Sequence, residues 1–174
     1  MPYQELELDH SKKFEKILKD SYMDPKENAK YPPVAISMGS RGGLEDFPIC
    51  IGTHGNFSFI QAPPKSRKTF LVSLLTSAYV SGSNEYVDQM KGHSNGKITI
   101  HYDTEQGEYH AQRVFNRTHR MANQKDSYKT YSLREYSPQE RLEFIDWHIN
   151  RVSNLGLVVI DGIADLINDV NDIN

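Results

Sequence analysis

Cysteine is almost absent from this chain of 174 residues, in which Cys50 is the only one. One cysteine cannot build a disulfide framework or a cysteine-rich zinc site, so the classes of protein that depend on either are excluded. The composition fits a reducing compartment, and we expect the chain to be cytoplasmic.

Long hydrophobic runs and a basic excess are missing as well. No apolar stretch approaches the ~18 residues of a membrane span, and the first residues lack the basic start and apolar segment of a signal peptide. We therefore expect no association with a membrane. The formal net charge of −3 excludes a strongly basic domain held on DNA by bulk charge. A length of 174 residues with 37% hydrophobic residues predicts one folded domain.

The N-terminal 33 residues differ from the rest of the chain. Phe14, Ile17 and Leu18 share one face of a helical pattern that lysines surround. Asp24-Pro25 ends this pattern, and residues 25–33 are polar with three prolines. We expect an N-terminal helix and linker over residues 1–33, followed by the main domain over residues 34–174.

Strand and helix patterns alternate through the main domain. After a short apolar stretch at 34–38, strands are predicted at 57–61, 97–103, 128–133 and 157–160. Helices are predicted at 69–80, at 108–121 and from Ser137 to a stop at Gly156, while 85–96 has the pattern of a loop. This order is typical of an α/β fold with a mainly parallel sheet and helices on both faces. The wholly apolar run 157–160 indicates a strand buried on both faces.

Three polar segments follow predicted strands, at 62–69, 103–108 and 161–165. Ligands of parallel sheets bind beyond the carboxyl ends of the strands. We therefore expect these segments to converge on the functional site.

The first of these segments reads Ala62-Pro63-Pro64-Lys65-Ser66-Arg67-Lys68-Thr69. Its spacing and its final Lys-Thr match the phosphate-binding pattern G-x-x-x-x-G-K-[ST], but Ala62 and Arg67 stand where the pattern has glycine. At a helix N-terminus, inward N–H groups favour an anion, a lysine reaches phosphate, and a threonine hydroxyl ligates Mg²⁺. The simpler interpretation is a basic turn that contains proline. The nucleotide-binding candidates are Pro64, Lys65, Ser66, Arg67, Lys68, Thr69 and Phe70.

The other two segments supply acids. Asp161 ends the apolar strand, where it could hold a water molecule of Mg²⁺ beside Thr69, or could simply cap the next turn. Glu105 follows a strand that ends at Asp103, where a carboxylate could orient the water that attacks a γ-phosphate. The alternative is that both Asp103 and Glu105 are solvated loop acids.

With these three motifs in this order, the chain resembles the RecA-like P-loop ATPases, and most closely their RepA/DnaB-type and recombinase-type branch, which is also grouped with the AAA-family ATPases. The resemblance covers residues 34–174 and implies a three-layer P-loop NTPase core. It implies that Lys68 and Thr69 are the Walker A residues, Asp161 the Walker B aspartate and Glu105 the catalytic glutamate. It further implies ATP and Mg²⁺ as ligands, assembly into a homo-oligomeric ring or filament, and a role in DNA replication, mobilisation or recombination.

Cores of this family continue beyond the Walker B strand, so we expect a partial core whose DNA-binding elements lie outside these residues. The missing glycines leave open a second function, a degenerate P-loop scaffold or regulatory subunit with weak or no nucleotide binding. A P-loop kinase or other transferase is a third possibility, for which the sequence offers no lid or acceptor site.

Two further patterns carry less weight. His101, Asp103 and Glu105 alternate as a row of metal ligands would, but no second histidine follows at a matching spacing. Arg113, Arg117 and Arg120 share one helix face, which we expect to be solvated.

Overall fold

The computed structural model describes residues 2–28, 30–40, 48–63, 65–83 and 86–167, with side chains from residue 10 onward. The chain divides into two compact units, Met1–Tyr31 and Pro32–Asn174. No helix in the described ranges combines the length and the apolar character that a membrane crossing needs.

The first unit contains the helix α1, Pro2–Ser21. Phe14, Ile17 and Leu18 are exposed on it. The chain turns after the helix, because Asp24 accepts hydrogen bonds from the N–H groups of Lys26 and Glu27.

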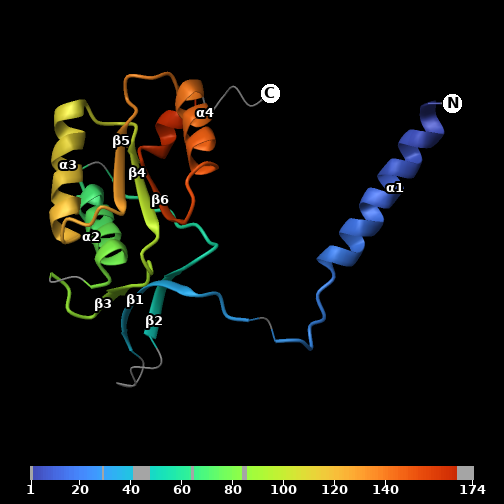
Figure 1. Ribbon diagram of the computed structural model, residues 1–174, viewed down its shortest axis with the longest axis horizontal. Helices are drawn as coiled ribbons and strands as arrows, with labels where there is room; N and C mark the ends of the chain where they lie inside the picture. The colour runs from blue at the N-terminus through green and yellow to red at the C-terminus, as the bar shows by residue number, and fades with distance from the viewer. Residues whose placement is uncertain (1, 29, 41–47, 64, 84–85, 168–174) are drawn as a thin grey trace. The chain divides into compact units, whose positions relative to one another are not determined.

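The second unit begins with a small antiparallel sheet in the strand order β2-β1-β3 (Figure 1). Its strands are β1 (Val34–Ser40), β2 (Pro48–Thr53) and β3 (Met90–Gly92). Both outer strands pair with β1 at Ile36, which lies opposite Gly52 on one side and Gly92 on the other. The sequence did not predict this sheet, and the prediction of a loop over 85–96 missed β3.

A second sheet, of three parallel strands, has the order β5-β4-β6. Its strands are β4 (Ile98–Asp103), β5 (Tyr128–Ser132) and β6 (Leu155–Asp161). The register places Asp103 opposite Ser132 on one side and Asp161 on the other. The carboxyl ends of all three strands therefore meet at one rim, which confirms the parallel α/β sheet that the sequence predicted.

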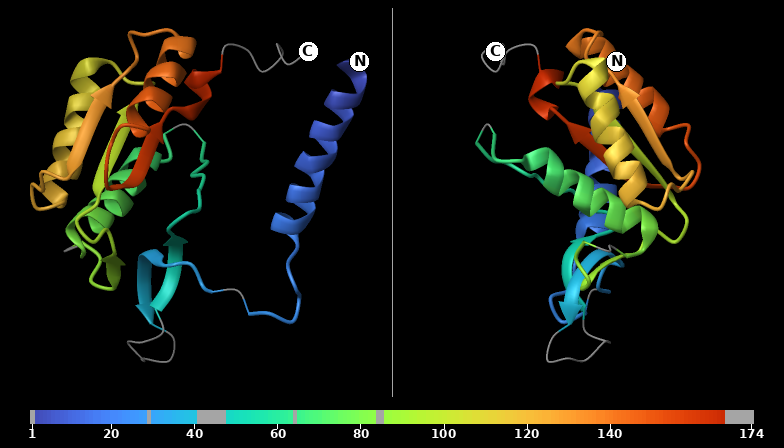
Figure 2. Two further views of the ribbon diagram at one scale, coloured as in Figure 1. Left: turned by 45° about the vertical axis from the view of Figure 1, so that its right-hand side comes forward. Right: turned by 90° about the vertical axis from the view of Figure 1, so that its left-hand side faces the viewer.

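Helices cover both faces of the parallel sheet and produce three layers (Figure 2). One face carries α2 (Lys68–Ser81) and α3 (Glu108–Met121), and the other carries α4 (Pro138–Ile149) and the short 3-10 helix η2 (Ile163–Leu166). Tyr79, Val80, Ala122 and Tyr128 form the core beneath α2 and α3. Ile100, Tyr102, Leu133, Ile145 and Leu166 form the core beneath α4.

Local sequence explains where these helices begin and end. Ser137 and Glu140 form a reciprocal capping box at the start of α4, with Pro138 as its first residue. Gly82 ends α2 in the left-handed conformation, and its N–H donates to the carbonyl of Ala78. The sequence predicts both of these helix ends, and the structure confirms them.

The strand predicted at 57–61 does not form. These residues belong to neither sheet, and Phe57 is 85% exposed. The alternation of large and small side chains predicts a strand, but a strand also needs a hydrogen-bonding neighbour, which periodicity cannot specify. The loop before α2 therefore follows a segment outside both sheets and does not follow a strand of the parallel sheet.

The sequence predicts the end of α4 at Gly156, and this prediction is wrong. The helix stops at Ile149, and Gly156 lies inside β6 instead of ending the helix. A side chain at Gly156 would collide with the hydroxyl of Tyr79 and with Cβ of Lys97, at 2.4 Å and 2.5 Å. The glycine is thus required by close packing against the strand and not by a helix end.

Candidate functional site

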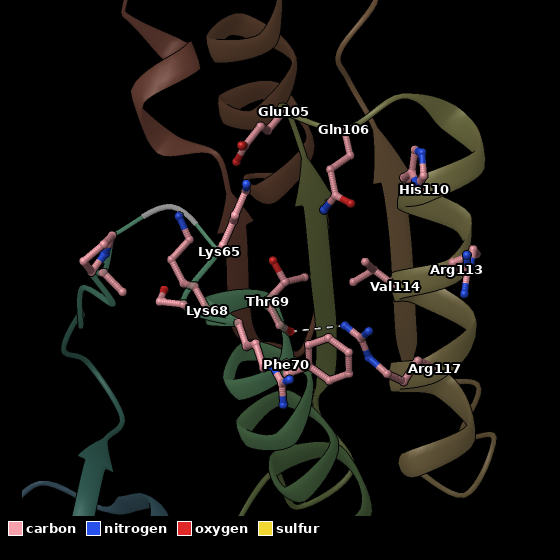
Figure 3. A pocket seen from close by; sticks show the side chains of 14 residues that line it. Lys65, Lys68, Thr69, Phe70, Glu105, Gln106, His110, Arg113, Val114 and Arg117 are labelled. Atoms are coloured by element: carbon pink, nitrogen blue, oxygen red, sulfur yellow. Dashed lines mark hydrogen bonds between the residues drawn. The ribbon is translucent and has the colours of Figure 1, made fainter.

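A cavity of about 540 Å³ lies at the start of α2, beside the rim where the parallel strands end (Figure 3). This volume falls in the range of pockets that bind small molecules. Residues from the loop before α2, the turn after β4 and one face of α3 line it: Ala62, Pro63, Lys65, Ser66, Arg67, Lys68, Thr69, Phe70, Glu105, Gln106, His110, Arg113, Val114 and Arg117.

The cavity brings together seven of the predicted site residues, which come from two segments far apart in the sequence. The loop contributes Lys65, Ser66, Arg67, Lys68, Thr69 and Phe70, and the turn contributes Glu105. Pro64 lies outside the described residues. Asp161 is not among the lining residues, although it ends β6 at the same rim.

The loop adopts an unusual backbone conformation. Lys65 and Arg67 both have a positive φ, at 65° and 64°, and Arg67 is left-handed at the N-cap of α2. Successive N–H groups in a turn of this kind can face one side, where they form a concavity that suits an anion. Arg67 thus takes, without being glycine, a conformation that glycine adopts easily.

The N-terminus of α2 has N–H groups that no side chain caps and that could bind an anion. No side chain caps it, and its first turn holds no acidic residue. Within the loop, the N–H groups of Ser66 and Phe70 already donate to the carbonyls of Pro63 and Arg67. The N–H groups of Lys68 and Thr69 belong to the first turn, where a helix offers no internal acceptor.

The charges of the lining residues favour an anionic ligand. Lys65, Arg67, Lys68, Arg113 and Arg117 are cationic, and Glu105 is the one carboxylate among the described lining residues. The side chains of Lys65 and Lys68 are directed toward the end of the cavity where Glu105 lies (Figure 3). The whole chain has a formal net charge of −3, so this concentration of cations is local.

The turn that carries Glu105 is fixed by hydrogen bonds to its neighbours. Asp103 is fully buried, and its carboxylate accepts from the N–H groups of Glu105 and Gln106 at 3.1 Å and 2.8 Å. The Thr104 hydroxyl donates to the carbonyls of Asp161 and Gly162. Asp103 therefore acts as the anchor of the turn and is not a solvated loop acid.

Burial is the main influence on the pKa of Asp103. Desolvation raises the pKa of Asp103, the N–H groups of Gln106 and Glu105 oppose that shift, and the charges of Asp161 and Glu105 add to it. Like charges at the ends of β4 and β6 thus repel each other across the rim.

The buried carboxylate of Asp161 has an unsatisfied oxygen. Asp161 is only 4% exposed, and its Oδ2 has no hydrogen-bond partner. An orphaned carboxylate oxygen at this rim suits a hard cation or its bound water, which is the role predicted for Asp161 with Thr69. No cluster of three or more His, Cys, Asp or Glu side chains fit for a metal occurs in the described ranges. Mg²⁺ commonly relies on one or two protein ligands plus phosphate oxygens.

The sequence did not predict that α3 forms one wall of the cavity. Arg113 and Arg117 line the cavity together with His110, whereas we expected their helix face to be solvated. Arg120 does not line the cavity, and it is exposed, as Arg113 also is; Arg117 is half-buried. The spacing of residues 110, 113 and 117 on the helix that follows Glu105 was the sequence pattern that could have indicated this wall.

His101 does not act as a member of a metal row in the described structure. Its ring is fully buried on β4, its Nδ1 lies 2.8 Å from the Tyr128 hydroxyl, and Phe115 packs edge-on against it. Burial, assisted by the positive charge of Arg117, lowers the pKa of His101 from 6.5 to about 4. The imidazole is therefore neutral in the folded chain at pH 7.

We expect acid to destabilise the fold through His101. Between pH 6.5 and 4 the unfolded chain binds a proton that the folded chain does not, so the free energy of unfolding falls as the pH falls. The contribution is about 2 kcal/mol at pH 5. Urea unfolding at pH 7.5 and pH 5 should show a smaller loss for His101→Gln than for wild type. The exposed His10→Gln serves as control, and an equal loss in all three proteins would contradict the assignment.

A second prediction follows from the left-handed conformation of Arg67. In a left-handed position a Cβ costs roughly 1–2 kcal/mol, which glycine avoids. We therefore expect Arg67→Gly to unfold at a higher urea concentration than Arg67→Ala, by about 1 kcal/mol in free energy, although alanine is the better residue in ordinary helices. Both variants remove the guanidinium, so their difference isolates the backbone. A more stable alanine variant would show that the loop does not hold this conformation in solution.

Comparison of the chain with family models, with curated proteins and with solved structures found no match.

Proposed function

We propose that this chain is an ATP-binding and ATP-hydrolysing module of the RecA-like P-loop type. The observation that carries the proposal is the shared cavity, in which Lys68, Thr69 and Glu105 meet although the turn and the loop are separated by a helix and two strands. The local excess of cations and the uncapped start of α2 support a phosphate-rich ligand.

The roles follow from the chemistry of each group. Lys68 and the N–H groups at the start of α2 bind the phosphate chain, and Lys65 and Arg67 add positive charge. Glu105 orients the water that attacks the γ-phosphate, because its carboxylate lies at the end of the cavity to which the lysines point. Thr69 and Asp161 would hold Mg²⁺, directly and through water. Bound Mg²⁺ would neutralise charge on the β- and γ-phosphate oxygens.

The oligomeric state and the cellular role of the module are also part of the proposal. By its resemblance, the module works as a homo-oligomeric ring or filament in DNA replication, mobilisation or recombination. The alternative of a degenerate P-loop scaffold rests on the two missing glycines, at the positions of Ala62 and Arg67. Arg67 holds a left-handed position, where glycine would let the backbone approach phosphate more closely.

A titration with a fluorescent ATP analogue and Mg²⁺ tests the proposal. Lys68→Ala should weaken binding by about 10- to 100-fold, because a hydrogen bond to a charged group contributes about 1.5–3 kcal/mol. The matched control is Lys129→Ala, which removes an exposed lysine on β5 outside the cavity and should bind as wild type does. Equal and negligible binding by wild type and Lys68→Ala would end the ATPase proposal and favour the scaffold.

A further inference from the structure

The end of the cavity opposite Glu105 has an aromatic wall. Phe70 lies in the first turn of α2, lines the cavity and is 58% exposed. The guanidinium of Arg117 covers part of the ring, with its central carbon 4.0 Å from the ring centroid. Phe70 and Arg117 meet between α2 and α3, away from the end to which Lys65 and Lys68 point (Figure 3).

Hydrogen bonds hold Arg117 in this position. Its Nε and Nη2 donate to the Ser73 hydroxyl at 3.2 Å and 2.9 Å, and Nη2 also donates to the Thr69 carbonyl at 3.3 Å. Ser73 is itself fully buried and accepts a hydrogen bond from Thr118. Arg117 thus spends three of its five N–H donors on α2, and the guanidinium presents a fixed plane to Phe70.

Burial and charge agree with a supporting role for Arg117. Arg117 is half-buried, and its guanidinium lies over the ring of Phe70. Desolvation lowers the pKa of Arg117 and the like charge of Arg113 adds to that shift, while Tyr128 and Asp161 partly offset it. A cation over one face of an aromatic ring is stabilising, so the pair forms a preorganised unit with ring surface left open to the cavity.

We propose that Phe70, backed by Arg117, is the platform on which the base of a bound purine nucleoside triphosphate stacks. The inference rests on the proposed function, because the phosphate chain is placed at the Lys65 and Lys68 end. A cavity of about 540 Å³ has room for more than phosphate. Two exposed aromatic rings, Phe70 and His110, are among its described lining residues, and Phe70 is the one that lies away from the end to which the lysines point (Figure 3). Stacking accepts any base with a large π-face, so ATP and GTP should bind alike and more tightly than CTP.

The experiment compares ATP with inorganic tripolyphosphate by isothermal titration calorimetry in the presence of Mg²⁺. Tripolyphosphate carries the phosphate chain without a base. Phe70→Leu should weaken ATP binding about tenfold or more, while tripolyphosphate binding changes by less than about twofold. Phe70→Trp keeps a stacking surface and should retain ATP affinity. The control is Phe59→Leu, which alters an exposed phenylalanine outside the cavity and should leave both affinities unchanged.

The outcomes separate this inference from the proposed function. A selective loss of ATP affinity in Phe70→Leu, rescued by Phe70→Trp, supports the platform. Equal losses for both ligands would mean that Phe70 only shapes the loop, and no loss would mean that the base lies elsewhere, so either result overturns the platform. Wild type that binds tripolyphosphate as tightly as ATP overturns the platform and leaves the phosphate site standing. Wild type that binds neither ligand overturns the proposed function and this inference together.

Discussion

Glu105→Gln is expected to slow ATP hydrolysis by about 10²- to 10⁴-fold, the contribution typical of a positioned general base. Glutamine keeps the shape of the side chain but cannot accept the proton of the attacking water. The turn itself should survive, because Asp103 holds it through the backbone N–H groups of Glu105 and Gln106. Affinity for ATP should therefore remain within about twofold of wild type.

Steady-state phosphate release at saturating Mg²⁺ and ATP measures this effect, with a separate titration for binding. Glu108→Gln is the matched control, since Glu108 begins α3 three residues later and does not line the cavity. It should hydrolyse ATP at the wild-type rate. Hydrolysis by Glu105→Gln as fast as by wild type would show that Glu105 has been given the wrong role.

Gly92→Ala is expected to destabilise the fold by about 3 kcal/mol or more, since overpacking against rigid backbone is among the costliest single changes. A Cβ at Gly92 would lie 2.0 Å from the carbonyl oxygen of Ala78 and 2.5 Å from Cα of Tyr79. Both atoms belong to the backbone of α2, so no side-chain rotation relieves the contact. The antiparallel sheet would have to move away from α2, the helix whose first turn lines the candidate site.

Gly52→Ala provides a close control for this prediction. Gly52 and Gly92 both pair with Ile36, from opposite sides of β1, but a Cβ at Gly52 meets nothing within 4 Å. We expect its free energy of unfolding, from urea titration, to stay within about 1 kcal/mol of wild type. Similar stability of the two variants would contradict the close packing of β3 against α2.

Local signals predicted much of the parallel-sheet region. The bounds of α3 were predicted to the residue, the capping box at Ser137 marks the start of α4, and the carboxyl ends of β4 and β6 meet as expected. These features were accessible because caps, periodicity and strand direction depend on neighbouring residues in the chain.

The candidate site was predicted only in part. Lys68 and Glu105 were selected from the sequence, and they line one cavity. Arg117 was assigned to solvent because helical periodicity shows which residues share a face but not what that face contacts. Its hydrogen bonds to Thr69 and Ser73 exist because α2 and α3 pack side by side on one face of the sheet.

The sequence by itself determined the three parallel strands and the helices between them, because strands and helices follow from short-range pattern and capping. It also shows which residue types stand at the strand ends. The tertiary structure alone decided that residues 57–61 pair with neither sheet, that Gly92 must lack a side chain, and that Phe70 stacks on Arg117. Each of these depends on which distant backbone or side chain lies alongside, and contacts of that kind form only when the chain folds.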